Sequence, residues 1–292
     1  MKKKIRIGQI ILNLLFIAIC LTYILPFLLL IAISITDEQV ISNVGYSLIP
    51  AKFSFQAYKI VFSSPEQLID SYETTIIFSI IHTALAVVVT TMTAYPLSRN
   101  GFKYKKILTW YIFITMLFGG GLVPSYLVNT KILHLGNTIW IYILPGLVSA
   151  WNVIIVRTFF QGIPESIVES AKIDGASEMG IFLRIMVPLS TPVMATIGFM
   201  TLVAKWNDWY TSLIYIKDTN LYSLQYMLQR ILNEVEFIKQ TASKDANFNQ
   251  YELPTEGVRY ATAILAAGPM LVIFPFFQKY FTKGMTIGAV KG

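Results

Sequence analysis

Three polar side chains interrupt an apolar segment of the sequence, residues 189–214. Lys205, Asn207 and Asp208 lie within it, although the segment is otherwise long and apolar enough to cross a membrane. Polar groups inside such a segment are costly, so they usually pair with one another or face a cavity. Lys205 and Asp208 are three residues apart and can pair on one helix face. The sequence therefore leaves two interpretations open, an internal ion pair and the polar wall of a cavity.

No group of residues in the sequence has the spacing of a catalytic or metal-binding site. His82 and His134 are far apart, and no Cys, His and carboxylate residues cluster together. The sequence contains no HExxH motif, no paired carboxylates, no Ser/His/Asp set and no GxxxxGK(S/T) phosphate loop. We therefore expect no catalytic residue, no bound metal and no cofactor on this chain.

The composition is that of a chain whose solvent is lipid. Of the 292 residues, 55% are hydrophobic and 13% are charged, and the mean hydropathy is +0.60. Soluble domains carry about 25% charged residues, and a soluble chain with half as many would expose too much apolar surface. The net charge of +7 is not gathered into a basic stripe on a soluble segment, which argues against nucleic-acid binding.

Segments of about 20 apolar residues predict membrane-spanning helices. The sequence has six, so we expect an all-α polytopic membrane protein in which residues 1–292 form one transmembrane domain. We find no internal repeat, which disfavours a secondary transporter built from inverted repeats. The predicted spans are 10–33, 74–97, 107–128, 138–160, 189–214 and 260–281.

The distribution of basic residues predicts the orientation of these spans. If the N-terminus is cytoplasmic, the inner segments carry 14 Lys and Arg residues, the outer segments carry 8, and Lys205 within a span completes the 23. The outer total is spread over two long loops, 34–72 and 215–259, and one short one. Because basic residues are retained on the cytoplasmic side during insertion, both termini are expected in the cytoplasm.

The segment 163–188, between the fourth and fifth predicted spans, is amphipathic and cytoplasmic in this orientation. Pro164 suits the first turn of a helix, Gly175 suits its end, and Ser177 or Asp174 can cap a second short helix. Pro188 is expected to break the chain before the fifth span. The pattern predicts a helix, a glycine turn and a second helix. The second helix would place its apolar face at Met179, Phe182, Ile185 and Met186.

In the second outer loop, Leu221–Ile238 predicts an amphipathic helix. Such a helix either rests on the membrane and the other spans or serves as a docking platform for an external protein. The apolar residues that recur at helical spacing are Leu224, Met227, Leu228, Ile231, Leu232 and Val235.

The cytoplasmic segment resembles the EAA loop of permease subunits of binding-protein-dependent ABC importers. Ser170 and Val187 depart mildly from that pattern. Without this resemblance, the loop could equally be a cover for the ends of the bundle. The positions that carry the resemblance are Glu169, Ala171, Asp174, Gly175, Ala176, Phe182, Ile185 and Pro188.

Other segments narrow the resemblance to carbohydrate importers. Tyr95–Arg99 and Trp206–Trp209 are similar to segments of those permeases, and the tail 284–292 resembles the maltose-type "G" permease. Phe118–Pro124 and Phe274–Phe281 resemble a subgroup that imports oligosaccharides from complex polysaccharides, including uronate-containing ones.

This resemblance implies the type I ABC importer permease fold in a bacterial cell membrane. The chain would form half of a pore with a second permease subunit, a different chain. Two cytoplasmic ATPase subunits would bind ATP and magnesium, and an external solute-binding lipoprotein would deliver a sugar or oligosaccharide. The loop around residues 221–259 would contact that binding protein.

The resemblance also implies roles for two sets of residues. Glu169 would offer its carboxylate to a basic residue of an ATPase, and Gly175 would permit the sharp turn. The set expected to couple the chain to the ATPase is Glu169, Ala171, Ile173, Asp174, Gly175, Ala176, Met179 and Phe182. The set expected along the sugar path is Trp151, Asn152, Lys205, Trp206, Asn207, Asp208 and Trp209.

Several alternatives remain at this point. Trp151 and Trp209 could be anchors at the membrane interface rather than sugar contacts. A secondary transporter or channel would need no ATPase, and a membrane-embedded enzyme would need a catalytic cluster that the sequence lacks.

Overall fold

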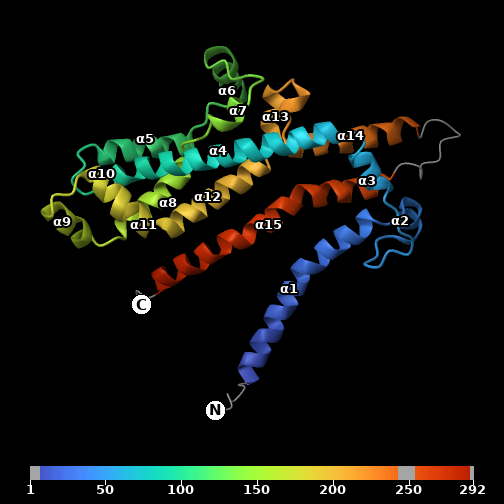
Figure 1. Ribbon diagram of the computed structural model, residues 1–292, viewed down its shortest axis with the longest axis horizontal. Coiled ribbons are helices and arrows are strands. Elements are labelled where there is room, and N and C mark those ends of the chain that lie inside the picture. Colours follow the sequence, from blue (N-terminus) through green and yellow to red (C-terminus); the bar gives the residue numbers. More distant parts are fainter. Residues whose placement is uncertain (1–6, 243–253, 290–292) are drawn as a thin grey trace. The chain divides into compact units, whose positions relative to one another are not determined.

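The computed structural model describes residues 7–242 and 254–289, and most of these residues are helical (Figure 1). Residues 1–6 with their basic side chains, 243–253 of the second outer loop and 290–292 of the tail lie outside the described residues. The chain divides into two compact units. One comprises Met1–Pro65 and Met227–Pro269, and the other Glu66–Tyr226 and Met270–Gly292.

The second unit is built on four helices, α4 (Pro65–Ser98), α5 (Lys105–Leu117), α8 (Ala150–Gln161) and α12 (Thr191–Trp206). Figure 1 shows them running alongside one another, with α9 (Glu165–Ile173) and α10 (Glu178–Ile181) at one end. Apolar side chains of α4, α8, α12 and the segment between α8 and α12 meet in one core. Its buried members are Ala94, Tyr95, Leu97, Val153, Val156, Phe160, Val168, Ile181, Phe182, Met186, Val193 and Ile197.

In the part of the chain that the structure describes, three helices are long and apolar enough to cross a membrane, within Gly8–Ser34, Pro65–Ser98 and Thr255–Gln278. They correspond to the first, second and sixth predicted spans, and the second starts several residues earlier than predicted. Two bent helix pairs also qualify, Lys105–Leu117 with Leu122–Ile132 and Glu178–Leu189 with Thr191–Trp206. The described residues therefore contain three candidate spans, or up to five if each bent pair is one.

The other three predicted spans are not continuous helices, and each break has a local cause. In 107–128, a run of three glycines ends at Gly121 with φ +81°, and the chain bends by 111° before α6 (Leu122–Leu127) and the π-helix η1 (Val128–Ile132). In 138–160, α7 (Trp140–Ile143) ends before Pro145 and Gly146, whose φ is +78°.

In 189–214, α12 ends at Trp206 and a short helix, α13 (Tyr210–Tyr215), follows. Asp208 lies between them and accepts hydrogen bonds from the backbone N–H and the hydroxyl of Thr211, at 3.0 and 2.7 Å. A carboxylate that caps the next helix in this way competes with continuation of the preceding one. The polar residues that weaken this span by hydropathy therefore end its helix.

The first unit contains α1 (Ile7–Ser34), α2 (Glu38–Val44), α3 (Gln56–Val61), most of α14 (Leu224–Ala242) and the start of α15 (Thr255–Ala289). The apolar window of α1 has no buried residue, as expected of a helix that faces lipid or a partner. The amphipathic helix predicted in the second outer loop is confirmed as α14, preceded by the 3₁₀ turn η3 (Thr219–Leu221). Its buried apolar residues are Leu224, Met227, Leu228 and Val235.

Candidate functional site

The loop 163–188 folds as a helix, a glycine turn and a second helix, as the sequence predicts. Helix α9 begins after Pro164 and ends at Ile173, and Gly175 follows with φ +78°. The backbone N–H of Gly175 donates to the Lys172 carbonyl at 3.0 Å, and that of Ala176 donates to the Ala171 carbonyl at 2.9 Å. This pair of bonds satisfies the last carbonyls of the helix and needs a left-handed residue, which glycine supplies without strain.

The second helix of the loop begins at a serine cap. The Ser177 hydroxyl accepts the backbone N–H of Gly180 at 3.1 Å, and α10 then continues into the π-helix η2 (Phe182–Met186) and α11 (Val187–Leu189). The predicted break does not fall at Pro188, because the helical backbone continues through Pro188 to Leu189. The bend of 76° comes at Ser190 instead.

Most of the residues expected to couple the chain to an ATPase lie on the surface of this loop. Ile173 is 87% exposed and Met179 is 56% exposed, although both are large and apolar. Phe182 is the exception, since it is only 7% exposed and its ring packs 5.2 Å from that of Tyr95. Phe182 is expected among the residues that contact the ATPase, but its side chain belongs to the chain's own core. Ala171 is half-buried against that core, while Glu169, Asp174, Gly175 and Ala176 are exposed.

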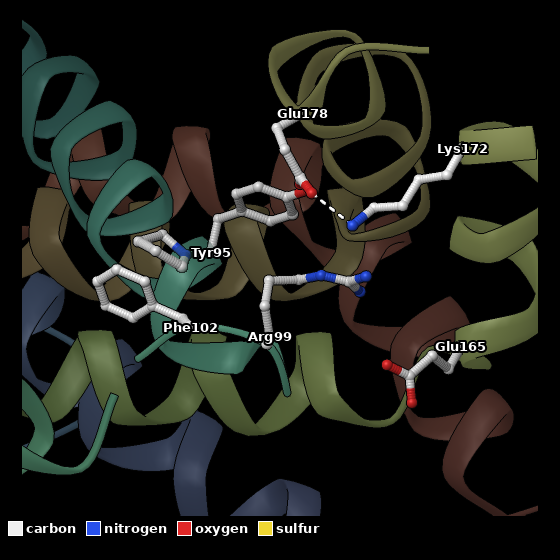
Figure 2. A pocket seen from close by; sticks show the side chains of 8 residues that line it. Tyr95, Arg99, Phe102, Glu165, Lys172 and Glu178 are labelled. Carbon is white, nitrogen blue, oxygen red and sulfur yellow. Dashed lines mark hydrogen bonds and ion pairs between the residues drawn. The ribbon is translucent and has the colours of Figure 1, made fainter. Parts of the chain in front are cut away.

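A cavity of about 390 Å³ lies between this loop and the end of α4 (Figure 2). The Tyr95 hydroxyl donates to one Glu178 carboxylate oxygen at 2.6 Å, and Lys172 pairs with the other at 2.6 Å. Figure 2 shows Arg99 extending across the same cavity, which Glu165 also lines. Sequence reasoning missed this network, although Tyr95–Arg99 had been singled out as a motif and Lys172 and Glu178 flank the predicted turn.

A second cavity, of about 330 Å³, lies among α4, α8 and α12 beside the break that follows α7. Asn152 and Lys205, two of the predicted sugar-path residues, line it. The Lys205 ammonium donates to the Tyr142 carbonyl at 2.9 Å, and His82 Nδ1 donates to the Ile143 carbonyl at 2.7 Å. These two side chains satisfy carbonyls that the end of α7 leaves without helical partners. The other lining residues are Ala86, Gly146, Leu147, Ser149, Met200, Thr201 and Ala204.

The ion pair expected between Lys205 and Asp208 is present, but it is long. The two charged groups approach to 3.9 Å, while the bonds of Lys205 to Tyr142 and of Asp208 to Thr211 are much shorter. Lys205 therefore also caps the end of α7, and Asp208 caps the start of α13. The sequence did not reveal either contact. Both interpretations left open by the sequence hold for Lys205, since it is paired and also lines a cavity.

The remaining predicted sugar-path residues do not line this cavity. Trp206 is buried, with its ring 6.4 Å from that of Tyr72. Asn207 is exposed and donates to the Val203 carbonyl at 2.8 Å, and Trp151 and Trp209 are exposed. The structure instead adds His82, Ser149 and Thr201 to the cavity wall, three residues that hydropathy could not single out.

Comparison with known proteins agrees with this architecture. Residues 86–287 match the model of the family "binding-protein-dependent transport system inner membrane component". Protein LplC of Bacillus subtilis is 40% identical over 92% of this chain and 90% of its own length. The polygalacturonan/rhamnogalacturonan transport system permease protein YtcP of the same organism is 37% identical over 96% of this chain and 95% of its own length.

A solved structure has the same fold. It is a bacterial ABC transporter involved in the import of the acidic polysaccharide alginate. The likeness covers 96% of this chain and 99% of that one, with a TM-score of 0.76 and 22% sequence identity.

The helical fold and the family match define a membrane protein of the ABC importer permease class. The chain belongs to the family of inner membrane components of binding-protein-dependent transport systems. It is a multi-pass protein of the cytoplasmic membrane and the non-catalytic permease subunit of its transport complex. This membership excludes the alternative of a secondary transporter or channel that works without an ATPase.

Proposed function

We propose that this chain forms one half of the pore of an importer for acidic oligosaccharides derived from polysaccharides. It would cross the membrane six times, with both termini in the cytoplasm and residues 1–292 acting as one transmembrane domain. The similarity to YtcP supports an acidic substrate. It covers nearly the whole of both chains, and polygalacturonan is a polymer of uronate sugars. The fold supports the pore, since the likeness to the solved transporter extends over nearly the whole chain.

The loop 163–188 would couple this chain to one of two ATPase subunits, which bind ATP and magnesium. Glu169 would pair with a basic side chain there, while Ile173 and Met179 would enter an apolar cleft. Their exposure supports this role, since large apolar side chains in contact with water mark a surface that a partner covers. Asp174, Gly175 and Ala176 would shape the turn that fits the cleft.

The cavity beside α7 would be part of the path of the sugar. It is the observation that carries the substrate class, because a lysine ammonium and several hydrogen-bonding side chains line a cavity among apolar helices. Irregular backbone is tolerated at membrane depth only where it is buried in protein or lines a cavity, and Gly146 and Ser149 come from such a segment. Lys205 would face a uronate carboxylate, and Asn152 would bind hydroxyl groups.

Three further partners complete the proposed assembly. A second permease subunit, a different chain, would form the other half of the pore. An external solute-binding lipoprotein would deliver the oligosaccharide and would dock on the outer loops, with the exposed face of α14 as part of the contact. Phe237 on that face is 68% exposed, which suits a contact with another protein.

The test is uptake of a labelled oligogalacturonide and of a neutral oligosaccharide of the same length by cells that carry Lys205→Gln. Glutamine removes the charge and keeps N–H groups that can donate to the Tyr142 carbonyl, on a side chain one bond shorter than that of lysine. We expect uptake of the uronate to fall about tenfold or more while neutral uptake is unchanged, because a lost charge-assisted hydrogen bond is typically worth about 1.5–3 kcal/mol.

Lys131→Gln is the matched control, since Lys131 is exposed and outside the cavity. It should leave uptake of both sugars unchanged. An equal loss of both sugars in the Lys205 variant would count against an acidic substrate. Failure of an ATPase to co-purify with the wild-type chain would count against the importer itself.

A further inference from the structure

We propose that Tyr95, Lys172 and Glu178 join the coupling loop to α4, so that movement of the loop moves the wall of the sugar cavity. Tyr95 and Glu178 are then positioning residues for transport and touch neither substrate nor nucleotide. This inference rests on the proposed function, because it takes the loop 163–188 as the part that the ATPase moves.

The three residues come from three different elements and meet at one carboxylate. Tyr95 lies in the last turn of α4, Lys172 in the last turn of α9, and Glu178 is the first residue of α10. The tyrosine hydroxyl and the lysine ammonium each lie 2.6 Å from a different oxygen of Glu178. These two charge-assisted bonds join the two helices of the loop to the end of α4.

The tyrosine side chain is held in one orientation by its neighbours. It is 8% exposed, and its ring lies edge-on to Phe160 at 6.3 Å and beside Phe182 at 5.2 Å. Its hydroxyl therefore points at Glu178 without free rotation of the ring. The carboxylate itself is more than half exposed, so the solvent weakens its ion pair with Lys172 more than its bond to the buried tyrosine.

Helix α4 connects this contact to the second cavity. His82 and Ala86 line that cavity, and both lie on α4. The thirteen steps along the helix from His82 to Tyr95 span about 20 Å at 1.5 Å per residue. Helix α4 is continuous from His82 to Tyr95, and its internal proline, Pro96, follows Tyr95, so the helix carries a displacement of Glu178 at one end to the cavity wall at the other. The geometry thus gives a continuous route from the ATPase side of the chain to the sugar path.

A second contact ties the loop to the same region and provides a control. Asn100, just after α4, donates to a Glu165 carboxylate oxygen at 2.9 Å, and both side chains are exposed. It joins α9 to the same end of α4, but Asn100 lies beyond the helix and is not held by a core. We expect it to contribute little to transmission, since exposed polar contacts are screened by water.

The experiment uses the complete transporter in lipid vesicles, with both permeases, both ATPases and the binding protein. Sugar transport and ATP hydrolysis are measured in the same preparation for the wild type, Tyr95→Phe and Asn100→Ala. Tyr95→Phe keeps the ring and its packing and removes only the hydroxyl. We expect the complex to assemble normally and to transport about tenfold less sugar per ATP, because a bond to a charged group is lost. Asn100→Ala should match the wild type.

Glu178→Gln separates the two contacts of the carboxylate. Glutamine can still accept from the tyrosine hydroxyl, but it lacks the charge that holds Lys172. We expect a loss of sugar per ATP smaller than that of Tyr95→Phe, because the tyrosine bond is the less exposed of the two.

Three results would overturn the inference. One is an unchanged ratio of sugar to ATP in Tyr95→Phe. Another is an equal fall in assembled complex, ATP hydrolysis and transport, which would make Tyr95 a residue of fold stability alone. The third concerns the wild type, since a wild-type complex that hydrolyses ATP without binding-protein-dependent transport would overturn the proposed function together with this inference. If the wild type couples normally and Tyr95→Phe does too, only the inference fails.

Discussion

The cytoplasmic loop 163–188 and the broken segments 138–160 and 189–214 are built by different means. The loop takes its shape from local backbone preferences. Pro164 precedes the first turn of α9, and Gly175 adopts the positive φ that ends this helix. The broken segments are defined by contacts between residues far apart in sequence. Lys205, for example, closes the end of α7 by reaching a carbonyl 63 residues away.

This difference suggests how the two regions respond to force. A loop held by its own caps keeps its shape when it is moved, so it can transmit a displacement. A cavity wall held by side chains from several helices changes shape when one helix moves, because its hydrogen bonds cross from one element to another. Substitutions in the loop should therefore abolish coupling, while substitutions in the cavity should change what is transported.

The largest effect is expected at the glycine turn. Gly175→Arg requires a non-glycine residue at φ +78°, which costs about 1–2 kcal/mol, and places a long side chain where the loop would meet the ATPase. The protein should reach the membrane in normal amounts and transport nothing. Normal uptake by this variant, measured with the labelled sugar, would show that the loop does not couple the chain to an ATPase.

Substitution of Gly175 by two residues smaller than arginine distinguishes strain in the turn from a clash with the ATPase. Nothing lies within 4 Å of a Cβ built on Gly175, so the chain itself has room for a side chain. Asparagine tolerates positive φ better than alanine, although it is larger. If the turn geometry matters most, Gly175→Asn should transport better than Gly175→Ala. The opposite order would indicate that space in the partner's cleft is limiting.

The next largest effect is expected at Glu169, on the exposed face of α9. Glu169→Ala removes the carboxylate offered to the ATPase, and losing one partner of a buried charge pair typically costs about 2–5 kcal/mol. We expect the ATPase to dissociate from the purified complex and uptake to fall at least tenfold. Glu165→Ala is the control, because its carboxylate binds Asn100 within this chain. Equal losses in both variants would indicate a general charge effect of the loop.

Much of the fold could be predicted from the sequence wherever the signal is local. Hydropathy located α1, α4 and α15, and the caps located α9 and α10 around Gly175. Hydropathy could not locate the helix breaks, because a single glycine such as Gly121 or Gly146 hardly changes the mean hydropathy of an apolar segment. Their effect depends on a positive φ that only the folded backbone reveals.

The candidate site residues could also be predicted where the signal is local, and could not where it depends on distant contacts. The exposed residues of the loop follow a motif that occupies one stretch of chain, so the sequence could name them. Tyr95 and Glu178 are 83 residues apart, and neither is unusual within its own helix. Phe182 was assigned to the wrong surface because a sequence pattern gives the face of a helix but not what covers that face.

A moderate effect on sugar uptake is expected at Gly146, in the non-helical segment between α7 and α8 that lines the second cavity. Gly146→Ala strains a backbone at φ +78°, at a cost of about 1–2 kcal/mol, and adds a methyl group at the cavity wall. We expect a raised concentration for half-maximal uptake and a normal amount of sugar per ATP. Gly119→Ala is the matched control, since that glycine has no positive φ and open space around it. A changed sugar-to-ATP ratio in Gly146→Ala would contradict the separation between the two regions.

The smallest effect is expected from two helix caps, one in each region. Ser177→Ala removes the cap of α10, and Ser149→Ala removes the bond to the backbone N–H of Asn152 at the start of α8. Each loss costs about 1 kcal/mol.

The two variants can be compared directly, because both replace a capping serine by alanine. Ser177→Ala should lower the amount of sugar moved per ATP, since α10 begins at Glu178, which binds Tyr95 and Lys172. Ser149→Ala should leave that ratio unchanged and weaken uptake at low sugar concentration, because Ser149 lines the cavity.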